Sequence, residues 1–262
     1  MIHKLALFAL MLSLLLGAST PMPDTPDYSQ YMPGSTRFPM TDLGELATRL
    51  GSPDTYDRRG EVVWLDSFKY GLAPWQTSLV GVGATAKVVS TDTDISDFAL
   101  RLTGGSTLGG TVAIIKYFSL QTLARAGAEF SYMVPTAFDK LYVSVRRYDG
   151  TNMHLAQVRL TCVGGTWAYQ DAAGAYQDID SPGVWITTAN RYHNVKLVAD
   201  LENDEYLRLL YDNLEYPLSG IPILVAASPV DPGQAAVFSL TPRAGFNDYV
   251  QVGRAIVTGN EP

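Results

Sequence analysis

The sequence has a single cysteine, few charged residues and no cluster of basic side chains. Cys162 is the only cysteine, so no disulfide can form within the chain and a hydrophobic core must supply its stability. Charged residues make up 17% of the chain, below the usual ~25%, and the net charge is -7. Because phosphate binding requires clustered Lys and Arg, these features argue against nucleic acid as a partner.

The sequence has only one long apolar run, and it lies at the N-terminus. Residues 5–16 are mostly apolar, follow His3 and Lys4, and precede the small residues 17–20. The run is shorter than the ~20 residues of a membrane-spanning helix, so we expect no stable membrane span. The layout is typical of a secretory signal peptide over residues 1–20, which predicts an extracellular, secreted or virion location. A hydrophobic arm packed inside an assembly is the alternative.

Residues 21–60 are rich in Pro, Ser and Asp and contain too few apolar residues to form a core. This composition predicts an extended arm. Leu43, Leu46, Ala47 and Leu50 recur at helical spacing, which predicts one short helix over residues 42–50 within the arm. Such an arm either packs on the main domain or docks onto a neighbouring subunit.

Residues 61–262 have the pattern of a β domain, and residues 139–162 show it most clearly. Leu141 and Val143 alternate with polar side chains, and residues 149–152, Asp-Gly-Thr-Asn, favour a hairpin turn. The sequence Ala-Tyr-Gln-Asp occurs at residues 168–171 and again at 175–178, which indicates a second, shorter hairpin. Residues 119–127 have a helical pattern. Further strands are predicted at residues 61–66, 78–89, 98–103, 111–118, 128–134, 193–201, 205–211, 235–241 and 248–258. The fold class is therefore all-β, a two-sheet antiparallel jelly-roll sandwich.

The order of these segments resembles the concanavalin A-like lectin/glucanase superfamily, including laminin-G-like modules. The resemblance covers residues 61–258 and is carried by residues 64–68, 71–75, 100–102, 139–162, 193–200 and 206–209. It implies a lectin-like jelly roll. The arm, with Asp27-Tyr28-Ser29 and Pro33-Gly34-Ser35 ahead of such a module, is also similar to accessory structural proteins of tailed bacteriophages.

No catalytic constellation is visible in the sequence. Retaining glucanases need one carboxylate as nucleophile and a second as acid. Here Glu129 stands alone, and the nearby strand carries Arg146 and Arg147. The three histidines are too scattered for a zinc site. We therefore expect the chain not to be an enzyme and to need no cofactor, with calcium as the one open question.

Three carboxylates are weak candidates for a calcium site. Asp92, Asp94 and Asp97 offer oxygen donors within one short segment, although their spacing is not that of an EF-hand. A polar connection between strands is the simpler interpretation. The resemblance implies an ion held between the first and last strands, and there the last strand carries Arg254 in place of acids.

Exposed aromatic side chains next to polar groups are candidates for glycan binding, because aromatic rings stack on sugar faces. The hairpin places several on its polar face, although aromatics on strands are more often core residues or cross-strand pairs. Trp75 and Trp185 are further aromatic candidates. The glycan-binding candidates are Tyr142, Arg146, Tyr148, Gln157, Arg159, Trp167, Tyr169 and Tyr176.

The sequence leaves two functions open. The first is a non-enzymatic structural or assembly protein, exported or virion-associated, whose arm docks onto other protein subunits in a homo-oligomer or larger assembly. The alternative is an extracellular, lectin-type glycan-binding module. The arm favours the first function, because a simple lectin has no use for it.

Overall fold

The computed structural model describes residues 57, 59–90, 97–107, 109–118, 124–179 and 191–262. The predicted signal peptide, the helix over residues 42–50 and almost all of the predicted arm lie outside these residues, as do Asp92, Asp94 and Trp185. The described part of the chain contains no helix long and apolar enough to cross a membrane.

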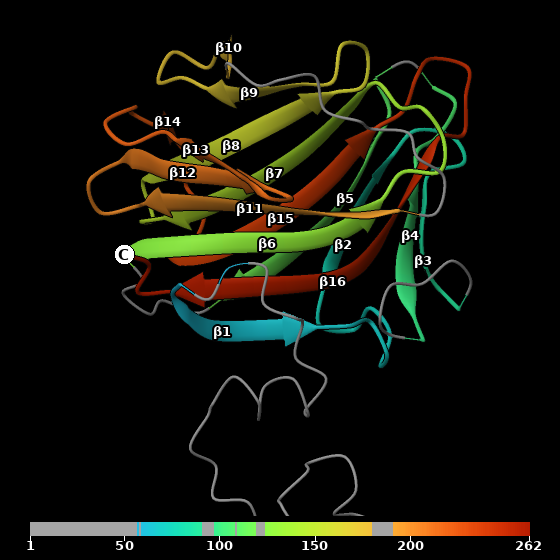
Figure 1. Cartoon of the computed structure of the whole chain (residues 1–262), viewed down its shortest axis with the longest axis horizontal. Coiled ribbons are helices and arrows are strands. Elements are labelled where there is room, and N and C mark those ends of the chain that lie inside the picture. Colours follow the sequence, from blue (N-terminus) through green and yellow to red (C-terminus); the bar gives the residue numbers. More distant parts are fainter. Residues whose placement is uncertain (1–56, 58, 91–96, 108, 119–123, 180–190) are drawn as a thin grey trace, which may run out of the picture. The chain divides into compact units, whose positions relative to one another are not determined.

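Two antiparallel sheets form a sandwich, which confirms the predicted fold class (Figure 1). The first, sheet A, has β6 and β16 at its centre. The first half of β16 pairs with β4, and its second half pairs with β1. The strand order of sheet A is β13 (Leu214–Pro217), β12 (Glu205–Tyr211), β11 (Tyr192–Asp200), β6 (Arg125–Met133), β16 (Tyr249–Gly259), β4 (Ala99–Thr103) and β3 (Thr85–Val89), with β1 (Glu61–Asp66) beside β16.

Sheet B is built around the predicted hairpin. Its strand order is β10 (Tyr176–Asp178), β9 (Thr166–Gln170), β8 (Asn152–Thr161), β7 (Lys140–Tyr148), β15 (Gly233–Thr241), β5 (Thr111–Phe118) and β2 (Gln76–Val80), with β14 (Leu224–Ala227) paired to β8. The turn of the β7–β8 hairpin is held by Asp149, whose Oδ1 accepts the amides of Thr151 at 2.7 Å and Asn152 at 2.6 Å. Gly150 has a φ of 93°, a left-handed conformation that favours glycine.

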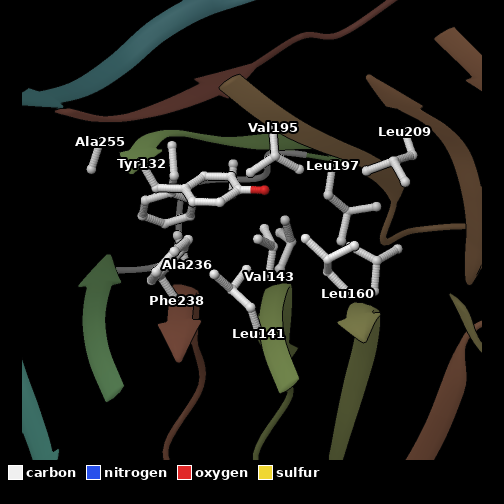
Figure 2. Close-up of a cluster of buried hydrophobic side chains, with 14 of the residues drawn as sticks. Tyr132, Leu141, Val143, Leu160, Val195, Leu197, Leu209, Ala236, Phe238 and Ala255 are labelled. Carbon is white, nitrogen blue, oxygen red and sulfur yellow. The ribbon is translucent and has the colours of Figure 1, made fainter. Parts of the chain in front are cut away.

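The core lies between the sheets and takes alternate side chains of the central strands, as the period of a strand requires. Phe130 of sheet A packs on Phe238 of sheet B with ring centroids 5.0 Å apart. Figure 2 shows labelled side chains from both sheets pointing toward one another. They are Tyr132, Val195, Leu197, Leu209 and Ala255 from sheet A, and Leu141, Val143, Leu160, Ala236 and Phe238 from sheet B.

Some predicted elements need correction. The single strand expected over residues 78–89 is two strands, β2 and β3, which lie in different sheets. Gly81 and Gly83 separate them and have φ values of 113° and 86°, which few other residues adopt. The helix expected over residues 119–127 is wrong for residues 125–127, because these belong to strand β6, which begins at Arg125. Residues 119–123 lie outside the described part.

Charged residues from the beginning and the end of the domain's sequence meet on the outer face of sheet A. Lys196 lies between inward-facing Val195 and Leu197 and is fully buried. Its Nζ contacts Asp57 Oδ2 at 2.9 Å and Glu261 Oε1 at 2.6 Å, and Arg208 pairs with the other oxygen of Glu261. We call Asp57, Lys196, Arg208 and Glu261 the ion network. It ties the residues before β1 and the C-terminus to the same sheet.

Candidate functional site

The outer face of sheet B combines small buried side chains with large polar and aromatic ones. One row across the sheet runs from Ala168 through Arg159, Tyr142 and Ser239 to Ala113. The small members of the row are buried, whereas Arg159 and Tyr142 are half-buried. Large side chains therefore have room to lean over small neighbours and to interact with one another.

Four of these side chains, Tyr142, Gln157, Arg159 and Tyr176, contact one another, and Arg146 lies on the same face close enough to act on the pKa of Tyr176. We call these five residues the tyrosine–arginine cluster. The rings of Tyr142 and Tyr176 lie 6.1 Å apart at 59°. The guanidinium of Arg159 lies over the ring of Tyr176, 4.1 Å from its centroid. The amide of Gln157 donates to the hydroxyl of Tyr176.

Tyr176 belongs to the short strand β10, and the β9–β10 turn holds that strand in place. Asp171 Oδ1 accepts the backbone amides of Ala173 at 3.0 Å and Ala175 at 2.9 Å. Its Oδ2 accepts the side-chain amide of Gln177 at 2.8 Å. These bonds, the one from Gln177 first, lower the pKa of Asp171, so the turn is held by a carboxylate at neutral pH. The second hairpin predicted from the sequence is thus present, and it delivers Tyr176 to the cluster.

Tyr206 of sheet A fixes the backbone beneath the cluster. Its hydroxyl accepts a hydrogen bond from the backbone N–H of Gln157 at 2.9 Å. The same hydroxyl lies 3.0 Å and 2.8 Å from the backbone carbonyl oxygens of Gln157 and Gln170. It therefore bridges β8 and β9 just beyond the last paired residues of those strands, Val158 and Tyr169. Burial raises the pKa of Tyr206, so its proton stays available for these contacts.

Burial also raises the pKa of Tyr142 and of Tyr176. Arg159 opposes this rise in both tyrosines, and the bond from Gln157 opposes it in Tyr176. Both tyrosines therefore keep their protons at neutral pH and present neutral hydroxyl groups. The cluster can stack on an apolar sugar face through its rings and hydrogen-bond sugar hydroxyls through its polar ends.

The structure brings five of the eight predicted glycan candidates together and separates the other three. Tyr148 shares the outer face but is only 6% exposed. Trp167 is fully buried in the core against Tyr211, and Tyr169 packs its ring edge on Tyr206. Trp75, the other described tryptophan candidate, is also buried and donates to Asp66 at 2.8 Å. Tyr148, Trp167 and Trp75 are therefore too buried to serve as stacking platforms in this structure. Tyr169 is half-buried, and its role stays a prediction.

One exposed aromatic on this face was not predicted. Tyr117 of β5 is 44% exposed and lies across Ala235 from Arg146. The alternation of residues 111–118 indicates which side chains share a face, but the pairing of β5 with β15 joins segments far apart in the sequence. Sequence reasoning therefore had no signal that places Tyr117 near Arg146.

The calcium prediction stays open. Asp97 is exposed, and its two predicted partners lie outside the described residues. Where the chain is described, no group of three or more His, Cys, Asp or Glu side chains is placed to hold a metal ion.

Solved structures share this fold, although the sequence matches no protein-family model and no curated protein. The cellulose induced protein matches with a TM-score of 0.51 at 11% identity, over 74% of this chain and 96% of that one. A carbohydrate esterase of the Shiga toxin-encoding bacteriophage phi24B matches with a TM-score of 0.49 at 15% identity, over 77% and 100%. The Bacillus licheniformis β-glucanase matches with a TM-score of 0.47 at 12% identity, over 77% and 99%.

The match to the cellulose induced protein shows a shared fold, a jelly-roll sandwich of two antiparallel sheets. This agrees with the jelly-roll fold that the sequence resemblance implies. At these identities the matched structures show the fold and not an activity.

The prediction that the chain is not an enzyme was drawn from the missing pair of carboxylates, and it is wrong. Matched structures include enzymes, among them the phage carbohydrate esterase and the β-glucanase. A missing pair of carboxylates argues only against the glycosidase mechanism that requires it.

Proposed function

We propose that the tyrosine–arginine cluster on the outer face of sheet B binds carbohydrate. The observation that carries the proposal is the pair of half-buried rings, Tyr142 and Tyr176, with Arg159 and Gln157 fixed against Tyr176. Rigid aromatic rings beside a few placed polar groups are typical of sites for small polar ligands. The jelly-roll fold and the carbohydrate-related names of the matched structures support the same ligand class.

The cluster is held before any ligand arrives. Tyr206 fixes the backbone of Gln157, the Asp171 turn fixes β10, and the side chain of Gln157 holds the hydroxyl of Tyr176. Ordering such side chains on binding costs about 0.5–1.5 kcal/mol each when they are free. Because these contacts already order them, most of the stacking energy remains available for binding.

The test is a glycan array followed by calorimetry on the glycan that binds best. Tyr176→Ala removes one ring from the cluster and is expected to weaken binding by about 10-fold or more, equivalent to ~1.4 kcal/mol. Tyr70→Ala is the matched control, because Tyr70 is 86% exposed and packs against no part of the core. An array without any bound glycan, or equal affinities for both variants, would refute the proposal.

The assembly role predicted from the arm stays a separate prediction. Deletion of residues 21–52 leaves the ion network intact, and a loss of oligomeric mass in solution would support that role. The mass of the mature chain tests the predicted signal peptide.

A further inference from the structure

Acidic residues are unevenly distributed between the two sheets. The chain has 26 Asp and Glu residues and a net charge of -7, yet the strands β2, β5, β15, β7, β8, β9 and β14 of sheet B contain none. The one acidic residue in a strand of sheet B is Asp178, at the end of β10. In sheet A, by contrast, acids occur in β1, β6, β11, β12 and β13.

The two arginines of the cluster lack a carboxylate partner within the described residues. Arg146 Nε donates to Ser144 Oγ at 3.2 Å, and Arg159 lies over Tyr176. The Nε atom of Arg159 is buried and has no hydrogen-bond acceptor among the described residues. Four other arginines pair with carboxylates, Arg59 with Asp57, Arg125 with Asp200, Arg208 with Glu261 and Arg243 with Asp248, whereas Arg147 lies 3.3 Å from His154 Nε2.

On this face the one carboxylate in a strand is Asp178, which lies across Ala168 from Arg159 and forms no ion pair with either arginine among the described residues. An arginine without a carboxylate partner presents positive charge to a ligand. A guanidinium can donate two parallel hydrogen bonds to a carboxylate or a sulfate, and such charge-assisted bonds are about twice as strong as neutral ones. The overall charge of the chain repels anions, so the attraction is local to this face. A neutral sugar would use the rings and Gln157 but would leave both charges uncompensated.

Resting on the proposed function, we infer that the saccharide bound by the cluster is acidic and carries a carboxylate or sulfate group that Arg146 and Arg159 receive. The rings of Tyr142 and Tyr176 take the apolar face of the sugar. The arginines select for the charged substituent. Arg159 then has two roles, because it also packs on Tyr176, whereas Arg146 contacts neither ring of the cluster in an aromatic stack.

The experiment starts from a glycan array that contains neutral, uronic-acid-containing and sulfated glycans. The best glycan is then titrated by calorimetry together with its neutralised form, a methyl ester for a uronate or a desulfated chain for a sulfate. Neutralisation is expected to weaken binding by about 10-fold or more. Added salt is expected to weaken binding of the charged form only.

Arg146→Gln keeps a polar side chain and leaves the stacked rings untouched. It is expected to weaken binding of the charged glycan by about 10-fold and to weaken binding of its neutralised form much less, and equal losses for the two forms would overturn the charge selection. Lys87→Gln, at an exposed position of β3 in sheet A, is the matched control and should change neither affinity.

The outcomes separate the two proposals. An array on which only neutral glycans bind, or a neutralised glycan that binds as tightly as its charged form, overturns the acidic preference and leaves carbohydrate binding in place. An array on which no glycan binds overturns both. Uronate and sulfated positives distinguish the two possible anionic groups.

Discussion

Removal of the buried amine of Lys196 is expected to destabilise the sandwich strongly. The side chain is fully buried and its Nζ contacts Asp57, Glu261 and the carbonyl oxygen of Arg59 at 3.1 Å. In Lys196→Met a methionine of similar length fills the space, but the two carboxylates lose their shared cation. Breaking a buried pair from one side costs about 3–5 kcal/mol.

The lower end of that range applies here, because each carboxylate keeps an arginine. Asp57 retains Arg59 at 2.8 Å and Glu261 retains Arg208. We therefore expect Lys196→Met to lower the free energy of unfolding by about 3 kcal/mol. Urea unfolding of the full chain at neutral pH, followed by circular dichroism, measures this value.

Two further variants make the result decisive. Lys87→Met changes an exposed lysine and is expected to stay within about 0.5 kcal/mol of the native protein. The double variant Lys196→Met/Glu261→Gln should lose less than the sum of its single variants, by at least about 1 kcal/mol, because the two side chains are in contact. A loss below about 1 kcal/mol for Lys196→Met, with an unchanged urea slope, would refute the assigned role of the network.

Three other predictions concern the sheets and the cluster. Burial raises the pKa of Glu129 to about 7 against the opposing effects of Lys196 and Arg254, so the folded state favours its protonated form. As pH rises from about 4.5 to above 7, the free energy of unfolding of the native protein should therefore fall relative to that of Glu129→Gln. The same pH dependence of this free energy in both proteins, measured by urea unfolding, would contradict the prediction. Gly105→Ala should destabilise by about 1–3 kcal/mol in the same assay, because its Cβ would lie 2.4 Å from the carbonyl oxygen of Val82, and an unchanged midpoint would count against that contact. Trp167→Phe should lower stability but leave glycan affinity in calorimetry unchanged; a selective loss of affinity would return Trp167 to the binding site.

Local patterns in the sequence predicted most strands and the central hairpin correctly. Residues 139–162 form β7 and β8 in the expected register, with Tyr142 opposite Arg159. Such hairpins depend on neighbouring residues, so alternation and turn chemistry suffice to place them. The order of the strands within each sheet depends instead on pairings between distant segments, such as β6 with β16, for which no local signal exists.

The burial of Trp167 could not be predicted for the same reason. Trp167 and Tyr169 alternate with Thr166, Ala168 and Gln170, and neither set is clearly the polar one. Aromatic rings suit a core face as well as an exposed face, so the sequence left their side undecided. Burial against the other sheet decides it.

The ion network was also invisible in the sequence. Lys196 alternates with Val195 and Leu197, a pattern that normally places a lysine in water. It is buried because Asp57 and Glu261, from the two ends of the domain, lie against it.

The most direct test of the central claim is a crystal structure of the chain with the glycan that binds best on the array. We predict density for a sugar ring against Tyr142 and Tyr176, with its charged group within hydrogen-bonding distance of Arg146 or Arg159. A glycan bound at sheet A, at a loop or at the sheet edges, with the tyrosine–arginine cluster empty, would contradict the account.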